Sequence, residues 1–462
     1  MKLNNLSIHK KATLEDSLNL IELNQLGAIF VVDQAGSVIG LATDGDIRRH
    51  LIQGGSLTDS ISLCANPDYT WEKPEASREL LIKKLDSKIK IIPLLDEAKH
   101  LVDVVTLDHL PIQNERAVYS RARAPVRVSF GGGGSDLTRY FFKNDGAVLN
   151  STISLYSHAT LHIRGDEKII VRSQDLNESL EANDLESALA LPGRFGLIQA
   201  LLGMINPKFG FELFLHSDFP MSSGLGGSAA VTAVVLGCFN QFRRDQWDRH
   251  ELAELAFQAE RHCFGVAGGW QDQYATVFGG FNFIEFQMDQ NIVHPLRVPV
   301  KTLLELEESL VLCDTGIAHS SGEIHEDQHE RMMDHNIQLL VDGGVRLSYE
   351  MRNHLLRGRL LEFGQCLDKI WQLKRKLSDK ISSADLDQIY SGAKSNGAAG
   401  GKILGAGGGG FFLFFAAPHK KYKLIEHLER SGLKTSPFRF EPEGLQAWTF
   451  RESVNYSVSK MP

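Results

Sequence analysis

The chain has 462 residues, a formal net charge of −8 and a pI near 6.1, with 43% hydrophobic and 23% charged residues. This length suggests about three folding units, and the acidic balance argues against a general binder of nucleic acid or of anionic membranes. The five cysteines are scattered without CxxC spacing, as is typical of a reducing compartment, and no apolar run reaches the roughly 18 residues of a membrane helix. We therefore expect a cytoplasmic protein with no nucleic-acid or membrane partner, whose local pockets can still bind phosphorylated substrates.

The first 112 residues predict a module made of two related halves. In the first half, a helix capped by Thr13 is followed by two strands around a turn at Gly36 and by a second helix from about Asp44. The second half repeats this order more loosely, with helix 76–85, strand 89–96, strand 100–107 and the segment DHL. Two such copies suggest an internal pair packed about a pseudo-twofold axis.

The stretch GLATDGD, residues 40–46, resembles the ligand-binding stretch of a cystathionine-β-synthase (CBS) domain. CBS pairs bind adenine nucleotides between their halves, and the resemblance implies that Thr43 and Asp46 hold the ribose of such a nucleotide. The second half has Asp103 and His109 where the pattern has glycine and aspartate, so we expect at most one nucleotide site. The alternative is a packing or dimerisation module without a ligand. Because CBS pairs often dimerise, a homodimer is also expected.

A polar segment, residues 113–122, is expected to link this module to a new pattern that starts at residue 123. There APVRVSF alternates as a strand does, four consecutive glycines follow, and Ser135 with Asp136 marks a helix start. Glycine is favoured where the backbone must approach a ligand closely or adopt a positive φ. The loop is therefore a candidate for such an approach, with a carboxylate directly after it.

Residues 216–242 contain a proline turn and a serine/glycine loop that lead into a long apolar helix opened by Ser228. Glycine-rich loops that feed helix N-termini bind anions, because unpaired N–H groups and the helix dipole point at the ligand. The hydroxyls of Ser222, Ser223 and Ser228 are candidate ligands for phosphate or metal. The loop is neither a Walker A motif, which would end in G-K-S/T, nor the G-x-G-x-x-G of a dinucleotide-binding unit.

Residues 251–286 predict an amphipathic helix that ends near Cys263, a glycine loop that presents Asp272, and a hairpin-like strand. Glu260 and Arg261 lie in the last turn of the helix. Phosphoryl transfer requires one carboxylate to orient or deprotonate the acceptor hydroxyl and another to hold the magnesium that neutralises the phosphates. The alternative for Glu260 is a simple charge partner of Arg261.

Residues 395–416 predict a helix end, a strand, a glycine turn and a second strand, and GAAGGK there is one residue short of a P-loop. His325, Glu326 and His329 have the H-E-x-x-H spacing of zinc proteases, but their polar flanks indicate a solvated helix face. His319 and Ser321 precede them and are candidates for lining a sugar pocket.

The three glycine-rich segments together resemble the motifs of the galactokinase–homoserine kinase–mevalonate kinase–phosphomevalonate kinase (GHMP) superfamily. PMSSGLGGSAA resembles its phosphate loop, KILGAGGGG its C-terminal glycine motif and APVRVSFGGGGSD its first motif. Within the superfamily, RVSFGGGGSDLTRYF, QDQYATVFGGFNFI, DTGIAHSSGEI and KILGAGGGGFFLFF resemble heptose 7-phosphate kinases. The resemblance covers residues 121–430 in the order of the family.

The resemblance implies an α+β fold, in which the CBS pair of residues 1–112 precedes a two-domain kinase. Its ATP-binding domain, ribosomal protein S5 domain 2-like, would span residues 123–300, and a ferredoxin-like C-terminal domain would span residues 301–462. The implied cofactors are ATP and Mg²⁺.

The resemblance also assigns roles to single residues. Asp272 would be the base for the acceptor hydroxyl with Arg127 beside it, although a purely structural salt bridge is the alternative for Arg127. Ser228 and Glu260 would hold Mg²⁺. The residues implied for the ATP phosphates are Ser222, Ser223, Gly224, Leu225, Gly226, Gly227, Ser228 and Ala229, with Gly227 replacing a serine of the family motif. The residues implied for the sugar are Gly133, Gly134, Ser135, Asp136, Gly408 and Gly409.

The implied reaction is ATP-dependent phosphorylation of the anomeric hydroxyl of a small-molecule sugar phosphate, D-glycero-D-manno-heptose 7-phosphate, for nucleotide-activated heptose and surface polysaccharide synthesis. The alternatives are a fucokinase-like or other hexose 1-kinase, and a nucleotide-regulated sugar sensor without turnover. A phosphate already on the sugar would need cations at the far end of the pocket, for which Arg139, Arg194 and Lys402 are candidates.

Overall fold

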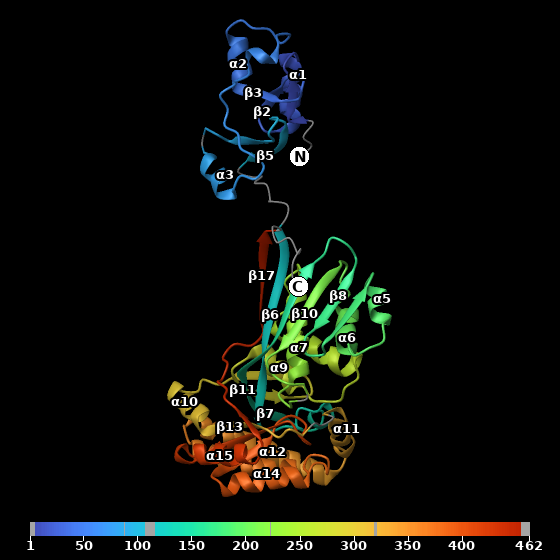
Figure 1. The fold of residues 1–462 in the computed structure, drawn as a ribbon, viewed down its shortest axis with the longest axis vertical. Helices are drawn as coiled ribbons and strands as arrows, with labels where there is room; N and C mark the ends of the chain where they lie inside the picture. Colours follow the sequence, from blue (N-terminus) through green and yellow to red (C-terminus); the bar gives the residue numbers. More distant parts are fainter. Residues whose placement is uncertain (1–4, 87, 107–115, 222, 318–320, 454–462) are drawn as a thin grey trace. The chain divides into compact units, whose positions relative to one another are not determined.

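The computed structural model describes residues 5–86, 88–106, 116–221, 223–317 and 321–453 of the chain. These residues form two compact units, one of residues up to Arg116 and one of Ala117–Ser453, drawn as a ribbon in Figure 1. Each buried hydrophobic cluster lies within one unit or the other, so each unit has its own core. In the described part of the chain, no helix is long and apolar enough to cross a membrane.

The first unit repeats one short topology twice, as the sequence predicts. Its elements are β1 (Ser7–His9), α1 (Leu14–Asn24), β2 (Ala28–Val32), β3 (Val38–Thr43), α2 (Asp44–Ile52), a 3-10 helix (Ile61–Leu63), α3 (Arg78–Lys84), β4 (Ile91–Leu95) and β5 (Leu101–Thr106). In the first half, β1 lies parallel to β2 and β2 antiparallel to β3. In the second half, Glu72 bridges Leu94 in the parallel sense and β4 pairs antiparallel with β5. The segment DHL predicted to end the second copy lies outside the described residues.

The first domain of the second unit is a mixed sheet covered by helices. Its strands are β6 (Arg116–Gly131), β7 (Gly146–Ile163), β8 (Ile169–Ser173), β9 (Glu178–Ala182), β10 (Phe211–Ser217), β11 (Phe281–Phe286), β12 (Asn291–Pro295) and β17 (Gln446–Ser453). The sheet has the order β12-β11-β7-β10-β8-β9, and β6 pairs with both β7 and β17. Strand β10 lies parallel to β8 and antiparallel to β7, which makes the sheet mixed, as expected.

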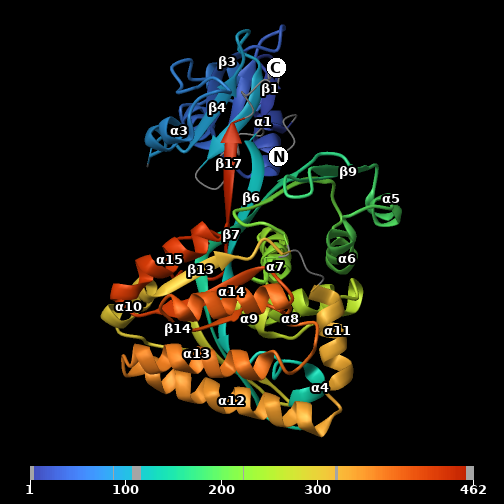
Figure 2. The ribbon, with the colours of Figure 1, turned by 60° about the horizontal axis from the view of Figure 1, so that its bottom comes forward.

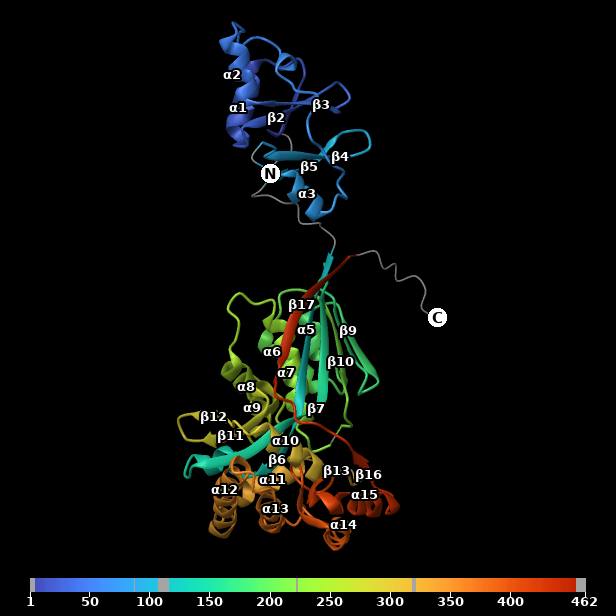
Figure 3. The ribbon, with the colours of Figure 1, turned by 90° about the vertical axis from the view of Figure 1, so that its left-hand side faces the viewer.

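The helices of this domain are α4 (Thr138–Phe141), α5 (Leu185–Ala190), α6 (Gly196–Ile205), α7 (Gly227–Asn240), α8 (Arg249–Gln258), a π-helical turn (Ala259–Cys263) and α9 (Gln271–Phe278). Helices α6, α7, α8 and α9 lie on one face of the sheet (Figure 3). Helix α7 is apolar all round and buried from Thr232 to Asn240, as a helix enclosed by other elements must be. Its enclosure fixes the position of the loop that precedes it.

The C-terminal domain has the predicted ferredoxin-like topology. Its elements are α10 (Val300–Ser309), β13 (Leu310–Asp314), α11 (Ser321–Arg331), α12 (His335–Leu356), α13 (Leu360–Lys374), α14 (Ala384–Ser395), β14 (Ala398–Ile403), β15 (Phe411–Ala416), a 3-10 helix (Pro418–Lys420), α15 (Lys421–Arg430) and β16 (Lys434–Ser436). The antiparallel sheet has the order β14-β15-β13-β16. Helices α13 and α14 pack against it, and α12 lies against α13 (Figure 2). Residues 395–416 form the predicted strand, glycine turn and strand.

Two expected boundaries differ from the structure. Strand β6 begins at Arg116, inside the segment 113–122 that was expected to be a linker. Its alternating charged residues, such as Arg121 and Arg123, gave it a polar composition, although Ala122 between them is buried. Strand β17 pairs with β6, so the end of the region 301–462 belongs to the first sheet rather than to the C-terminal domain.

Candidate active site

The serine/glycine loop enters helix α7 through backbone conformations that favour glycine. Gly224 and Gly226 have φ of +76° and +79°, which residues with side chains rarely adopt. Gly226 is the N-cap of α7 and supplies no side-chain cap, so the helix start presents backbone N–H groups that suit an anion. This helix start is compatible with ATP phosphates at residues 222–229, which stay a prediction. Leu225 is fully buried and offers only its backbone, and Ser222 lies outside the described residues.

Arg127, on β6, joins this loop to Asp272. Its Nε and NH2 groups donate to the two carboxylate oxygens of Asp272, both at 2.8 Å, and its NH1 group donates to the Gly224 carbonyl at 2.7 Å. The backbone N–H of Arg127 also donates to the carbonyl of Leu225 at 3.0 Å. Arg127 is only 4% exposed. Since bidentate charge-assisted pairs are strong and directional, Arg127 both supports the loop and orients the predicted base.

Asp272 lies in the first turn of α9 rather than in a loop, which corrects the sequence-based expectation. The helix starts directly after Trp270, whose ring stacks on Phe257 with the centroids 3.6 Å apart; this tertiary contact leaves no local signature in the sequence. A Cβ on Gly226 would lie 3.3 Å from Oδ2 of Asp272. The loop backbone therefore passes directly beside the carboxylate, and a phosphate on the loop would be its neighbour.

Ser228 and Glu260, predicted to hold Mg²⁺, lie in contact. The Ser228 hydroxyl donates to the Glu260 carboxylate, and Gln273 Nε2 donates to the other carboxylate oxygen at 2.6 Å. Arg261 lies 3.7 Å from the same carboxylate, so Glu260 is also its charge partner. Mg²⁺ commonly takes one or two carboxylates together with substrate phosphates, and this hard oxygen pair fits the ion. Among the described residues, no group of three or more His, Cys, Asp or Glu side chains is arranged to hold a metal.

The carboxylate of Asp136 points into the same site. It is 9% exposed and accepts hydrogen bonds from the N–H groups of Gly134 at 3.0 Å and Gln271 at 3.2 Å. Burial raises the pKa of Asp136, and the nearby charge of Asp272 raises it further. The first glycine motif and the start of α9 are thus tied together through one carboxylate.

Ser135, also predicted to face the sugar, has a different position. It is fully buried, its hydroxyl donates to the Gly132 carbonyl at 2.8 Å, and it accepts from the Ala147 N–H at 3.0 Å. A Cβ on Gly132 would lie 1.9 Å from the Ala147 carbonyl oxygen. At this position glycine is therefore required by close packing on β7, and Ser135 fixes the loop there rather than lining the pocket.

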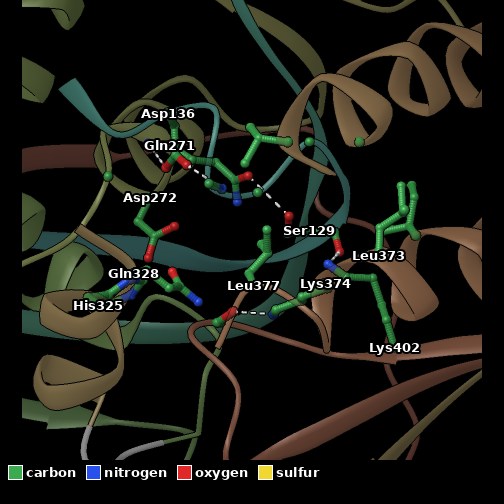
Figure 4. Close-up of a pocket in the computed structure, with 18 of the residues that line it drawn as sticks. Ser129, Asp136, Gln271, Asp272, His325, Gln328, Leu373, Lys374, Leu377 and Lys402 are labelled. Carbon is green, nitrogen blue, oxygen red and sulfur yellow. Dashed lines mark hydrogen bonds between the residues drawn. The ribbon is translucent and has the colours of Figure 1, made fainter. Parts of the chain in front are cut away.

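Arg127, Asp136 and Asp272 line one pocket, shown in Figure 4, whereas the loop residues 223–229 and Glu260 are not among its lining residues. Strand β6 and helix α9 form one side, and α11, α12, α13 and β14 of the C-terminal domain form the other. Gly133 and Gly134 contribute backbone. The polar and charged side chains that line the pocket are Arg127, Ser129, Asp136, Arg261, Gln271, Asp272, His325, Gln328, Lys374 and Lys402.

Of the three cations considered for a substrate phosphate, only Lys402 lines the pocket. Its Nζ donates to the Ser129 carbonyl at 2.5 Å. Arg194 is exposed and pairs with Glu178 at 3.3 Å, and Arg139 donates to a backbone carbonyl of α11. Lys374 is a further lining cation that sequence reasoning missed, since its segment LKRKLSDK has the composition of a solvated helix end.

His325 was expected on a solvated helix face, and this expectation is wrong. His325 lines the pocket, and its buried Nδ1 has no hydrogen-bond partner among the residues that the structure describes. Burial, followed by the charge of Arg261, lowers its pKa to about 4. The 6% exposed Gln328 lies beside it. Helix α11 packs this face against the site although its sequence is polar. His319 and the side chain of Ser321 lie outside the described residues.

The backbone of the third glycine motif packs directly against the backbone of the loop that precedes α7. A Cβ on Gly405 would lie 2.7 Å from the Gly224 Cα, and the Phe411 N–H donates to the Ser223 carbonyl at 3.3 Å. Gly405 lines the pocket, whereas Gly408 and Gly409, predicted to contact sugar, are not among its lining residues. The Gly408 N–H instead donates to the Ile381 carbonyl at 2.8 Å.

In the first unit, Thr43 and Asp46 form a capping box at the start of α2. The Thr43 N–H donates to the Asp46 carboxylate at 2.9 Å, and the Thr43 hydroxyl accepts from the Asp46 N–H at 3.2 Å. Arg49 also pairs with Asp46. Capping of α2 is therefore a sufficient structural reason for both residues. The binding of a nucleotide at this site stays a prediction.

Three family models match the chain: CBS domain over residues 1–53, GHMP kinases N terminal domain over residues 195–280 and GHMP kinases C terminal over residues 351–432. The chain is 37% identical over 334 residues to D-glycero-alpha-D-manno-heptose 7-phosphate kinase of Campylobacter jejuni subsp. jejuni, covering 71% of this chain and 98% of that protein. It is 25% identical to L-fucokinase/L-fucose-1-P guanylyltransferase of Bacteroides fragilis, with 64% of this chain and 35% of that protein covered.

Solved structures give the same result. A D-glycero-D-manno-heptose 1-phosphate kinase from Bacteroides thetaiotaomicron matches with a TM-score of 0.60 and 28% identity, covering 71% of this chain and 98% of that one. Lactococcus lactis galactokinase shares the fold, with a TM-score of 0.56, 17% identity, and coverage of 71% of this chain and 95% of that one. The chain thus belongs to the GHMP kinase family, as a phosphotransferase with an alcohol group as acceptor, and carries a CBS domain at its N-terminus.

Proposed function

We propose that the enzyme transfers the γ-phosphoryl group of ATP to the anomeric hydroxyl of a heptose 7-phosphate and so forms the 1,7-bisphosphate. The observation that carries the proposal is the contact of the glycine loop with the Arg127–Asp272 pair, where a side chain on Gly226 would already touch the carboxylate. A donor phosphate on the loop and an acceptor hydroxyl at Asp272 would then be neighbours. The choice of sugar is supported by the name of the 37% identical relative.

In this reaction Asp272 would accept the proton of the attacking hydroxyl on a carboxylate oxygen. Arg127 holds both oxygens of that carboxylate, so it fixes the direction from which a hydroxyl can approach. Its charge also lies against the loop through the Gly224 carbonyl, where negative charge develops during transfer. Positioned acid–base groups of this kind contribute about 10²–10⁴-fold to a rate.

Ser228 and Glu260 would hold Mg²⁺ through their hydroxyl and carboxylate oxygens, next to the phosphates on the loop. The ion would supply charge neutralisation for the triphosphate. Gln273, whose Nε2 donates to Glu260, would keep the carboxylate oriented.

The sugar hydroxyls would contact polar side chains that line the pocket. Asp136 offers a carboxylate that backbone N–H groups already orient. His325, with a pKa of about 4, is neutral near pH 7, and its unpartnered Nδ1 suits a hydroxyl group. These groups give the pocket the polar lining that a polyol needs.

The test is product identification by phosphorus NMR. Full-length protein with Mg·ATP is offered a panel of heptose 7-phosphate, free heptose, fucose and other hexoses, in parallel with Asp272→Asn. The proposal expects a new anomeric phosphate signal with heptose 7-phosphate and its loss in the variant. Turnover of only an unphosphorylated sugar would replace the proposal with a fucokinase-like or hexose 1-kinase activity. ATP binding without turnover of any sugar would favour a sensor.

A further inference from the structure

The pocket carries more positive than negative charge. Four cationic side chains line it, Arg127, Arg261, Lys374 and Lys402, against only two carboxylates, Asp136 and Asp272. The chain as a whole has a net charge of −8. An excess of two positive charges inside an acidic protein therefore needs its own explanation.

The two arginines have acidic partners, whereas the two lysines do not. Arg127 pairs with Asp272 at 2.8 Å and Arg261 lies 3.7 Å from Glu260. Among the ion pairs of the described residues, none includes Lys374 or Lys402. The excess charge of the pocket thus lies on the lysines.

Within the described ranges, both ammonium groups donate hydrogen bonds to backbone carbonyls alone, which leaves N–H donors for a ligand. Lys402 is 2% exposed and donates to the Ser129 carbonyl at 2.5 Å. Lys374 donates to the carbonyls of Ile403 at 3.0 Å and Gly405 at 2.5 Å. Since an ammonium has three N–H donors, two remain on Lys402 and one on Lys374.

Burying an ammonium without a counter-charge is costly. Burial first and then the charge of Arg127 lower the pKa of Lys374 to about 7, although the carboxylates of Asp136 and Asp272 act in the opposite direction. Burial also lowers the pKa of Lys402, and the charge of Lys374 adds to this effect. Both pKa values are lowered because the site buries two ammonium groups with no anion bound between them. A dianion bound there would raise both pKa values again.

The lysines also have a suitable position for a second group of the substrate. In Figure 4, Lys374 and Lys402 lie across the pocket from Asp272. They come from α13 and β14, whereas Asp272 comes from α9. A sugar whose reacting hydroxyl lies at Asp272 would extend its other end toward the lysine pair.

We propose that Lys374 and Lys402 form a subsite for a phosphate monoester on the sugar acceptor, and that they select a phosphorylated sugar over the free sugar. This inference rests on the proposed function, because it assumes that a sugar occupies the pocket. Two ammonium groups supply the charge of a phosphate dianion, and their three free N–H groups can reach its oxygens.

The competing explanation is structural. Lys374 ties the carbonyls of Ile403 and Gly405 and could serve only to shape the third glycine motif, and Lys402 could serve only to hold β6 through Ser129. A purely structural role would affect all sugars alike. A phosphate subsite would affect only phosphorylated ones.

The experiment compares Lys374→Met and Lys402→Met with wild type on heptose 7-phosphate and on free heptose, at saturating Mg·ATP. Lys376→Met is the matched control, because Lys376 is exposed and does not line the pocket. We expect kcat/KM for heptose 7-phosphate to fall roughly 30-fold or more in each pocket variant, mainly through KM, as when one partner of a buried charged contact is truncated. The loss of kcat/KM for free heptose should be much smaller, so that each pocket variant loses the preference for the phosphorylated sugar. Equal losses on both sugars would overturn the subsite.

A direct measurement of phosphate binding distinguishes a failure of the phosphate subsite from a failure of the proposed kinase function. Inorganic phosphate is titrated calorimetrically into full-length protein whose nucleotide loop is saturated with Mg²⁺ and a non-hydrolysable ATP analogue. Binding to wild type and to Lys376→Met, but not to the two pocket variants, supports the subsite even if no sugar phosphate is turned over, an outcome that would reject the proposed function alone. Phosphate binding that survives in both pocket variants would overturn the subsite.

Discussion

Lys374 is a residue whose charge changes close to neutral pH. Its pKa of about 7 reflects burial first, then the positive charge of Arg127, with Asp136 and Asp272 acting in the opposite direction; Lys402 is a further neighbouring cation. Below its pKa the ammonium is charged and can bind a phosphate dianion. Above that value the free enzyme loses this charge, so binding of an anionic sugar weakens as the pH rises.

We therefore predict that kcat/KM for heptose 7-phosphate declines above a pH of about 7, by up to about tenfold per pH unit. The sugar phosphate has its own second ionisation near pH 6, so kcat/KM also falls on the acid side. Initial rates at limiting sugar phosphate and saturating ATP give the profile. In Lys374→Met the alkaline decline should be absent, and its persistence there would assign it to another group.

Glu260 allows a separate prediction about metal. Its carboxylate accepts hydrogen bonds from Ser228 and Gln273, and Glu260→Gln keeps the size of the side chain while it removes the charge. We predict that the Mg²⁺ concentration needed for half-maximal activity rises about 10-fold or more, because a carboxylate ligand is lost, while KM for the sugar changes little. Ser228→Thr, which keeps a hydroxyl, is the control. An unchanged Mg²⁺ requirement in Glu260→Gln would show that Glu260 does not bind the ion and serves only as the charge partner of Arg261.

The motifs with fixed spacing indicate which of their residues lie together. Arg127 pairs with Asp272 and Ser228 contacts Glu260, while their roles in catalysis and in Mg²⁺ binding stay predictions. Lys374 could not be found in this way. Its segment is amphipathic and basic like many solvated helices, and only the packing of α13 against β14 turns it inward.

At the scale of elements, the site depends on glycines that let two loops touch. The turn after β14 and the loop before α7 meet at Gly405 and Gly224, where backbone atoms replace side chains. Gly405 also has a φ of +63°. The third motif, in the C-terminal domain, therefore packs directly against the loop before α7 and limits the positions that this loop can take.

We predict that Gly405→Ala raises KM for ATP more than KM for the sugar, because its Cβ would press on the Gly224 backbone and displace the phosphate loop. The free energy of unfolding should fall by about 1–3 kcal/mol from the positive φ and the contact together. The matched control is Gly432→Ala, where φ is +80° but no atom lies within 4 Å of the new Cβ. The control should cost about 1 kcal/mol and leave both KM values unchanged. Equal effects of the two substitutions on KM for ATP would contradict this role.

Elements with a clear period or a strong cap were predictable, and those fixed by distant partners were not. The repeated pattern of the first unit, the apolar α7 and the paired strands β14 and β15 follow from local sequence. The start of α9 depends on Trp270 stacking on Phe257, and β17 depends on an open edge of β6 that is formed more than 300 residues earlier in the chain. Neither contact leaves a periodic signal of its own.

At the scale of the whole molecule, the chain combines two units with separate hydrophobic cores. The clusters of the first unit contain residues between Leu6 and Val105, and the large cluster of the second contains residues between Ala122 and Leu428. All the pocket residues belong to the second unit. Because folding stability is set largely by each core, the units should respond separately to core substitutions.

We predict that Leu14→Ala destabilises the first unit without impairing the kinase. Leu14 is fully buried at the start of α1, so the substitution should lower the free energy of unfolding of that unit by about 2–5 kcal/mol. Leu23→Ala, on the same helix at a side chain that is 68% exposed, should change it by no more than about 0.5 kcal/mol. Calorimetry should show one transition moved to lower temperature in Leu14→Ala and the other unmoved. Sugar phosphorylation measured below both transitions should equal that of wild type. A loss of kcat in Leu14→Ala with the second transition intact would instead mean that the folded first unit activates the kinase. The CBS domain would then have a regulatory role, although the capping of α2 by Thr43 and Asp46 explains these two residues without one.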